Sequence, residues 1–458
     1  MSRRRAARPR RPAVAHRYGR VATPIEERYA PDTVLVHGKF RSRHWDYSDH
    51  IVPPVSASAA YRLESVGRGA EGFLEFANPE FSRVTGAPIF IYDRLDEPTR
   101  GMLEENLALA EGGDRAVCFA TGMAAISAAL GVLLRSGDRL VAHRMLYGCT
   151  YSLFENWYPR FGIKVDLIDV SDPVALAAAL EGDDVMALYF ESPSNPTLQV
   201  IDFAAVRRAV TRANARRARR AHGRRHRRIF TVVDNTFATP FCQRPLGQGI
   251  DVVVHSLTKN LNGFGTDMGG VVVGPRMLEP DLLLYRKDYG APLAPRGAWS
   301  LLAYGLPSLP VRVRAQQRTA MVVARFLERH RRVRRVFYPG LPSHPQHALA
   351  RRQMRDPDGR FAPGGLLYFT LRGTPAQARR GGERMMNHIA KHSLAITLAV
   401  SLGQVRTLIE HPSSMTHAAL PPKEQVKAGL DPGGVRLSIG LEHPKDLIAD
   451  LREALARA

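Results

Sequence analysis

The sequence is poor in cysteine and has no long run of apolar residues. Its three cysteines, Cys118, Cys149 and Cys242, are an odd number without metal-ligand spacing, which argues against a disulfide framework and against a zinc site. No stretch approaches the roughly 20 apolar residues of a membrane-spanning helix, and no apolar segment follows the Arg-rich start as in a secretory signal. We therefore expect a cytoplasmic protein with no metal site and no membrane partner.

Acidic residues are fewer than basic ones, 43 against 65, and the formal charge is +22. Residues 1–20 and 211–228 hold eight and nine arginines and no acid, so the rest of the chain carries only +5. No aromatic residues interleave with the second run, as they would in a surface that stacks nucleic-acid bases. We interpret both runs as solvated surface without a specific nucleic-acid partner. A basic nucleic-acid-binding protein is the alternative from another class, and weak, salt-sensitive attraction to polyanions follows in either case.

The chain divides into three parts by pattern. Residues 1–85, with the basic tail 1–20, predict an irregular arm with little core of its own. Residues 86–310 alternate short β-rich runs with helical patterns, which is typical of a mostly parallel sheet with helices on both faces. Residues 311–458 open with a long helical pattern and predict a smaller α+β domain. The fold class is therefore α/β, with a large domain and a smaller C-terminal one.

Two charged residues follow apolar runs that predict buried strands. Asp234 ends "FTVVD", and Lys259 follows "DVVVH" in "HSLTKN". In open α/β sheets, the residues just past the carboxyl ends of the strands face the ligand crevice. We therefore expect Asp234 and Lys259 to face one cleft.

Two further segments are suited to a phosphate group. Gly122 and Met123 lie in "ATGMAAI", where a strand is expected to turn into a helix, and backbone amides at a helix N-terminus bind anions. An ordinary strand-to-helix turn explains that glycine equally well. Ser256 and Thr258 add hydroxyls beside Lys259. A reactive lysine, a carboxylate and a phosphate cradle are what pyridoxal 5'-phosphate requires.

From "VHGKF" (36–40) to the C-terminus, the motifs resemble those of the Cys/Met-metabolism family of pyridoxal-phosphate enzymes, the trans-sulfuration group of fold type I. The resemblance implies a fold type I transferase-like structure and a homotetramer built from dimers. It implies that Lys259 is the Schiff-base lysine and that Asp234 pairs with the pyridine nitrogen of the cofactor. It assigns the phosphate cradle to Gly122, Met123, Ser256 and Thr258.

The resemblance also assigns roles around the cofactor ring. Tyr147 in "LYGCT" matches the tyrosine that stacks on the ring and transfers protons, and core packing is the alternative role. Asn195 in "ESPSNP" matches the asparagine near the phenolic oxygen of the cofactor. Tyr92 and Arg94 in "YDRLDEPTR" match a pair that reaches the phosphate of the neighbouring subunit.

The substrate carboxylate is assigned to Ser401 in "AVSLGQV" and Arg436 in "GVRLSIG". A guanidinium binds a carboxylate through two hydrogen bonds. An arginine in an apolar strand is costly without an anionic partner, so a ligand role is favoured over a structural ion pair, which stays open.

The reaction is either γ-elimination or γ-replacement. Cys149 stands where most of the family has glycine, and Lys287 and Asp288 follow the cofactor lysine by about thirty residues. Both features resemble the methionine γ-lyase branch, which favours a γ-elimination lyase with Cys149 near the substrate. Cys149 can also be a small packed residue. A γ-replacement enzyme, such as a cystathionine γ-synthase or an O-acylhomoserine sulfhydrylase, is the alternative.

The sequence departs from the family pattern at three places. Asp96 and Glu97 replace an uncharged pair before "PT" and add charge near the expected dimer interface. Arg406 stands where relatives commonly have glutamate, which predicts repulsion of a distal ammonium and therefore poor cleavage of cystathionine. The arginine run at 211–228 is expected at the polar end of a helix that begins near "DFAAVRRAV", and it is expected to extend a surface loop there.

Overall fold

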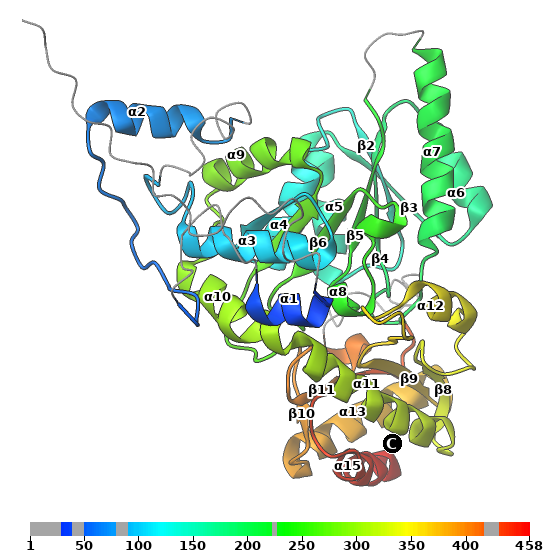
Figure 1. The fold of residues 1–458 in the computed structure, drawn as a ribbon. Coiled ribbons are helices and arrows are strands. Elements are labelled where there is room, and N and C mark those ends of the chain that lie inside the picture. The colour runs from blue at the N-terminus through cyan, green and yellow to red at the C-terminus, as the bar shows by residue number, and fades with distance from the viewer. Residues whose placement is uncertain (1–28, 39–49, 79–89, 222–226, 416–429) are drawn as a thin grey trace, which may run out of the picture.

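The computed structural model describes residues 29–38, 50–78, 90–221, 227–415 and 430–458 (Figure 1). The arginine-rich residues 1–20 lie outside these ranges. Within the described residues, the strands form one seven-stranded and one five-stranded sheet. The long helix α11 (Leu306–Glu328) leads along the chain into the second sheet.

The larger sheet has the strand order β1-β7-β6-β5-β4-β2-β3. Its strands are β1 (Arg115–Phe119), β2 (Arg139–His143), β3 (Lys164–Ile168), β4 (Val185–Glu191), β5 (Phe230–Asp234), β6 (Val252–Ser256) and β7 (Gly270–Gly274). Strands β3, β2, β4, β5 and β6 are parallel, and β7 runs antiparallel to both β6 and β1. The mostly parallel sheet expected from the alternating pattern is confirmed.

Both faces of this sheet are covered, which explains the valine-rich strands. Val253 and Val271 pack in one apolar cluster with helices α3 and α7, while Val252 and Val272 pack in a second cluster with α4, α5 and α9. Each buried valine contributes about 1.5–3 kcal/mol. The helices of this part of the chain are α3 (Pro98–Glu111), which precedes β1, and then α4 (Gly122–Gly131), α5 (Gly148–Asn156), α6 (Pro173–Ala179), α7 (Phe203–Arg220), α8 (Thr239–Cys242), α9 (Glu279–Tyr289) and α10 (Pro295–Ser300).

The second sheet lies at the C-terminal end of the chain, below the first in Figure 1. Its order is β10-β11-β12-β9-β8, formed by β8 (Val333–Phe337), β9 (Leu366–Leu371), β10 (Ile396–Leu398), β11 (Thr407–Glu410) and β12 (Gly434–Ser438). Its helices are α12 (His347–Gln353), α13 (Pro375–His392) and α15 (Pro444–Arg457). Helix α13 begins at a capping box, in which Thr374 and Gln377 bond each other's backbone amides. A separate apolar cluster fills this unit, as expected for a smaller α+β domain.

The described part of the N-terminal region is extended around two helices, α1 (Pro31–His37) and α2 (Val66–Glu75). Helix α1 packs against α11, whereas α2 stands away from both sheets (Figure 1). On α2, Val66, Phe73 and Leu74 are exposed by 92%, 62% and 63%. Apolar side chains gathered in this way commonly mark an interaction surface.

Up to Arg220, the basic run at 211–228 forms the polar end of a helix, as its pattern predicted. Helix α7 begins after Asp202, whose side chain accepts from the Ala205 amide, and continues to Arg220. The buried Arg217 donates to the Gly182 carbonyl oxygen. Arginine has a high helix propensity, which favours the continued helix. Residues 222–226 of the run lie outside the described residues.

None of the helices in the described part of the chain has the length and apolar character needed to cross a membrane.

Candidate active site

Three neighbouring parallel strands end in polar residues. Strands β4 and β5 pair with Glu191 opposite Asp234, and β5 and β6 pair with Asp234 opposite Val254. Ser256 ends β6 and Lys259 follows it. The structure therefore places Asp234, Ser256 and Lys259 at the carboxyl edge of the sheet, where α/β proteins bind ligands.

Lys259 is held by a residue of the smaller domain. Its Nζ atom donates to Ser401 Oγ at 2.7 Å. Burial and, to a smaller extent, the positive charge of nearby Arg436 lower the pKa of Lys259 to about 8. Within the described residues, no carboxylate oxygen lies within 4.0 Å of Nζ. This amine loses its proton more readily than an ordinary lysine, as a nucleophile or base must.

Asp234 lies at the end of β5 with its carboxyl group buried. Its Oδ1 atom accepts from the Thr236 amide at 2.9 Å. Burial raises the pKa of Asp234, whereas its hydrogen bonds with Thr236 and the charge of His255 lower it. No lysine or arginine pairs with Asp234 in the described ranges. A buried carboxylate without a cationic partner is costly, so this position suits a cationic ligand.

The two segments assigned to the phosphate are in contact. Thr121 caps α4, and its Oγ1 accepts from the Ala124 amide at 3.0 Å. A Cβ atom on Gly122 would lie 2.8 Å from Ser256 Cβ, so only glycine fits there. On the β6 side, Thr258 Oγ1 accepts from the Gly269 amide at 3.1 Å. Met123 follows Gly122 in the first turn of α4. The N-terminus of α4 and the segment from Ser256 to Thr258 therefore lie next to each other, as a shared phosphate site requires.

Tyr147 and Cys149 stand together at the start of α5. Cys149 Sγ donates to the Tyr147 hydroxyl oxygen at 3.3 Å, and Cys149 is exposed. Burial raises the pKa of Tyr147 well above its usual value, and the Cys149 hydrogen bond adds to the effect. The Tyr147 hydroxyl therefore keeps its proton near neutral pH, which suits a general acid.

Arg436 joins the two domains at the site. The buried guanidinium on β12 donates to Asn195 Oδ1 at 3.1 Å and to the Ser401 carbonyl oxygen at 2.9 Å. It also forms an ion pair with Glu410 Oε2 at 3.1 Å. A structural ion pair is therefore present, while the other hydrogen bonds direct the guanidinium toward the residues around Lys259.

Tyr92 and Arg94 are not brought to Lys259 within this chain. Arg94 Nη1 donates to the Lys287 carbonyl oxygen at 2.7 Å, and the guanidinium lies 5.6 Å from the centre of the Tyr92 ring. Tyr92 is 45% exposed. Their reach into a neighbouring subunit stays a prediction.

Two charged residues that depart from the family pattern, Glu97 and Arg406, have different surroundings. Glu97 is fully buried and caps α3, accepting from the Thr99 and Arg100 amides at 2.8 and 2.7 Å. Its charge is therefore met by the helix N-terminus inside the chain. Arg406 is exposed just before β11. In α9, Lys287 Nζ lies 3.2 Å from Asp288 Oδ1.

Sequence reasoning missed two carboxylates, Glu191 and Glu410. Glu191 accepts from the amides of Tyr147 and Asn195, and Glu410 pairs with Arg436. A signal was present in both cases, because each glutamate stands at the end of an apolar strand, "VMALYFE" and "TLIE". A buried carboxylate in such a strand requires hydrogen-bond donors or a cation.

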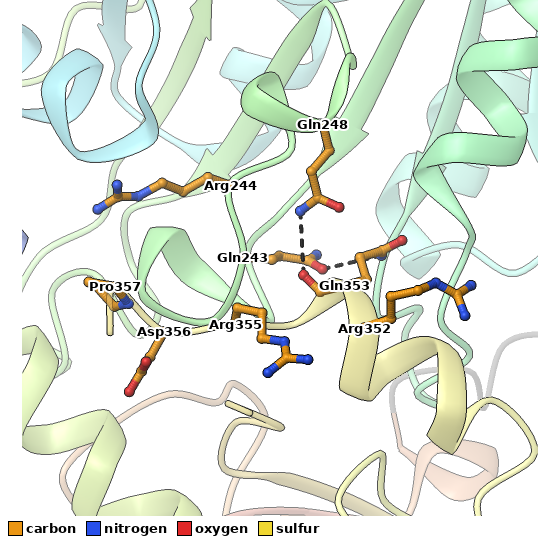
Figure 2. A pocket seen from close by; sticks show the side chains of 8 residues that line it. All are labelled: Gln243, Arg244, Gln248, Arg352, Gln353, Arg355, Asp356 and Pro357. Atoms are coloured by element: carbon orange, nitrogen blue, oxygen red, sulfur yellow. Dashed lines mark hydrogen bonds between the residues drawn. The ribbon is translucent and has the colours of Figure 1, made fainter. Parts of the chain in front are cut away.

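A separate hollow of about 400 Å³ lies where α12 approaches the larger domain (Figure 2). Its lining residues are Gln243, Arg244, Gln248, Arg352, Gln353, Arg355, Asp356 and Pro357. None of the predicted site residues lines it. In Figure 2 the three arginine side chains point in different directions, so they do not converge on one ligand.

Comparison with known proteins places the chain in a family. The model of the Cys/Met metabolism PLP-dependent enzymes matches residues 32–456. L-methionine gamma-lyase of Pseudomonas deceptionensis is 38% identical over 91% of this chain and 96% of its own length. O-succinylhomoserine sulfhydrylase of Pseudomonas aeruginosa is 37% identical over 80% of this chain. The structure of cystathionine gamma synthase from Xanthomonas oryzae, in complex with aminoacrylate and cysteine, superposes with a TM-score of 0.79 at 33% identity, covering 94% of this chain and 98% of that one.

The chain belongs to the pyridoxal-phosphate-dependent enzymes of cysteine and methionine metabolism. Its cofactor is pyridoxal 5'-phosphate, and it has the α/β fold of the fold type I members. The resemblance inferred from the motifs is confirmed.

The residues at the site fit this cofactor. Lys259 offers a desolvated amine, and Asp234 a buried carboxylate without a lysine or arginine partner in the described chain. Gly122 has no side chain, so none covers the first backbone amides of α4, and Ser256 can approach closely. These are the groups that would hold the aldehyde carbon, the ring nitrogen and the phosphate.

Proposed function

We propose that the enzyme catalyses γ-elimination from a sulfur amino acid such as L-methionine, and that its products are a thiol, a 2-oxo acid and ammonia. The observation that carries the proposal is the meeting of Lys259, Ser401 and Arg436, from two domains, at the edge of the sheet where Asp234 also lies. This arrangement provides a base, an anion-binding group and a cofactor anchor in one place. One water is consumed for each methionine cleaved.

The residues divide the work by their chemistry. When bound, pyridoxal 5'-phosphate supplies an electron sink for the charge left at the substrate α-carbon. Lys259 takes the α-proton, because its lowered pKa leaves more of the amine unprotonated near neutral pH than in an ordinary lysine. Arg436 binds the substrate carboxylate through its guanidinium. Tyr147 donates its proton to the departing sulfur on the γ-carbon.

Elimination is favoured over replacement by Cys149. Its thiol lies 3.3 Å from the Tyr147 hydroxyl, the group that we assign to leaving-group protonation. Several relatives with 37–39% identity are named methionine gamma-lyases. Replacement is the second candidate, since a sulfhydrylase and a cystathionine synthase are also similar.

An assay with and without an added thiol tests whether the enzyme performs elimination or replacement. Purified enzyme is supplied with O-acetyl- or O-succinyl-homoserine, with and without a thiol, and with methionine in parallel. We expect oxo acid from methionine, and only a minor thioether product when thiol is added to the acyl-homoserines. If only the acyl-homoserines react and thiol converts the product to a thioether, the enzyme is a γ-replacement enzyme.

Cystathionine is expected to be a poorer substrate than methionine. Arg406 is exposed just before β11, in the segment that follows Ser401, and its positive charge repels a distal ammonium. The test compares kcat/KM for the two substrates. Equal or better turnover of cystathionine would remove this role from Arg406.

Coupling of the cofactor to the apoprotein is expected to titrate near pH 8. Only the unprotonated amine of Lys259 attacks an aldehyde, and burial favours that neutral form, which lowers its pKa to about 8 from 10.5. The coupling rate, followed by absorbance, should rise from pH 7 and level off near pH 9. Nα-acetyl-lysine in the same buffers corrects for titration of the cofactor. A rate that still rises tenfold per pH unit up to pH 10 would show an ordinary lysine.

We also propose a homotetramer built from dimers, supported by the exposed apolar side chains of α2 and by the outward position of Tyr92 and Arg94. Replacing Phe73 and Leu74 together with aspartate should lower the mass in light scattering to that of a smaller assembly. Activity should fall with it. Val174→Asp, at an exposed apolar position on α6, is the matched control and should leave the mass unchanged. An unaltered mass for the double variant would exclude α2 from the interface.

We also propose that the enzyme is located in the cytoplasm. The exposed Cys149 thiol, placed next to the proposed acid, needs a reducing compartment to stay free. We expect the arginines of α7 to attract polyanions weakly, and we propose no specific nucleic-acid partner.

A further inference from the structure

Glu191 lies at the candidate active site, but it has no role in the mechanism proposed above. It ends β4 directly opposite Asp234 on β5, and only 5% of the residue is exposed. Partner residues on adjacent strands present their side chains to the same face of a sheet. The two carboxyl groups therefore share one face at the carboxyl edge.

The two carboxylate oxygens of Glu191 have different partners. Oε1 accepts from the Tyr147 amide at 2.6 Å, and Oε2 accepts from the Asn195 amide at 3.2 Å. Tyr147 is the residue from which α5 starts, and Asn195 accepts from Arg436. The Glu191 side chain therefore holds the backbone of Tyr147, the proposed acid, and that of Asn195. The Asn195 side chain in turn orients Arg436, which we assign to the substrate carboxylate.

Only a carboxylate matches this pair of donors. Both partners are N–H groups, and an ionised carboxyl group is an acceptor at both oxygens. Glutamine would offer one acceptor and one donor, so one of the two amides would face another N–H group. Aspartate would keep the charge, but its shorter arm would not span both amides as glutamate does.

The charge of Glu191 also bears on the cofactor. Neither Glu191 nor Asp234 has a lysine or arginine partner within the described ranges. Each raises the electrostatic cost of the other because both are buried, and burial followed by the charge of Asp234 raises the pKa of Glu191. A cation at this edge offsets that cost for both groups.

We propose that Glu191 is a positioning residue, which anchors Tyr147 and Asn195 through its two oxygens and adds a second carboxylate to the sheet face of Asp234, the residue that would hold the cofactor's ring nitrogen. The proposal rests on the proposed function for the identity of the cation. It separates into an anchoring role, which requires the length of glutamate, and an electrostatic role, which requires the charge.

Two variants distinguish these roles. Glu191→Gln removes the charge and one acceptor, whereas Glu191→Asp keeps the charge and shortens the arm. Each purified variant, with wild-type enzyme beside it, is stripped of cofactor and titrated with pyridoxal 5'-phosphate by absorbance. Values of kcat and KM for methionine, and the thermal unfolding midpoint, complete the set. Asp138→Asn is the control for the loss of a buried carboxylate at the opposite, amino end of the sheet, where Asp138 accepts from the Arg135 amide and pairs with Arg227.

Both variants should lose at least about tenfold in kcat, since a displaced proton donor costs on that scale. Only Glu191→Gln should also weaken cofactor binding, by about tenfold, the effect of one nearby charge. Asp138→Asn should change neither kcat nor cofactor binding. If Glu191→Gln does not fold, the fall in kcat of a folded Glu191→Asp still tests the anchoring role.

Two outcomes would overturn the proposal. In the first, both variants keep kcat, KM and cofactor binding within twofold of wild type. In the second, both lose stability and cofactor binding equally, which marks a role in folding only. Wild-type apoprotein that binds no pyridoxal 5'-phosphate would instead overturn the proposed function, so the two failures are distinguishable.

Discussion

Replacing Lys259 with alanine is expected to lower kcat for methionine by at least about 10³-fold, because the variant loses both the covalent anchor and the base. The Nζ atom lies at the carboxyl edge of the sheet, 2.7 Å from Ser401 Oγ, with its pKa lowered by burial. The absorbance band of the lysine-bound cofactor should disappear in the variant. Borohydride reduction of the wild type should leave the cofactor mass on the peptide that contains Lys259.

Ser401→Ala serves as the comparison for Lys259→Ala. It removes the hydroxyl that accepts from Nζ but leaves the amine, so the absorbance band should persist. A Lys259→Ala variant that keeps the band and a kcat within tenfold of wild type would contradict the assignment of Lys259.

Replacing Asp234 with asparagine is expected to lower kcat by about 10²-fold or more without lowering the stability of the apoprotein. Activity falls because the neutral amide no longer stabilises a cationic ring nitrogen. Stability is retained because burial raises the pKa of Asp234, so the ionised group destabilises the folded apoprotein above its unfolded pKa. Asparagine keeps an oxygen that accepts from the Thr236 amide.

The measurement pairs kcat with the thermal unfolding midpoint of the apoprotein. Near neutral pH the midpoint of Asp234→Asn should equal or exceed that of wild type, and below about pH 4 the difference should vanish as the carboxyl group protonates in both states. Unchanged kcat would remove the role in cofactor binding. A large fall in the midpoint would show that the carboxylate stabilises the fold instead.

The sheet and the positions of its charged strand ends were predictable because they depend on local pattern. Valine-rich runs followed by Asp234 and Lys259 indicated buried parallel strands with polar carboxyl ends, and both residues stand at that edge. The α4 turn could be predicted for the same reason, since Thr121 and Gly122 are typical of a strand-to-helix turn.

Other features depend on contacts between distant segments. Glu191 and Glu410 end apolar strands, but their partners Tyr147, Asn195 and Arg436 are far away in sequence. The arginine run was predicted at the polar end of a helix, and α7 does reach Arg220, but the burial of Arg217 in α7 could not be predicted from its charge. The role of Arg94 depends on a second chain, which one sequence cannot place.

Cleavage of L-methionine without any added acceptor tests the proposed reaction most directly. Purified enzyme with pyridoxal 5'-phosphate is incubated with L-methionine, and 2-oxobutanoate, ammonia and methanethiol are measured together, with Lys259→Ala as the blank. We predict the three products in equal amounts from the wild type and none from the variant. If methionine is left intact while O-acyl-homoserines are consumed, the site performs replacement and the elimination proposal is wrong.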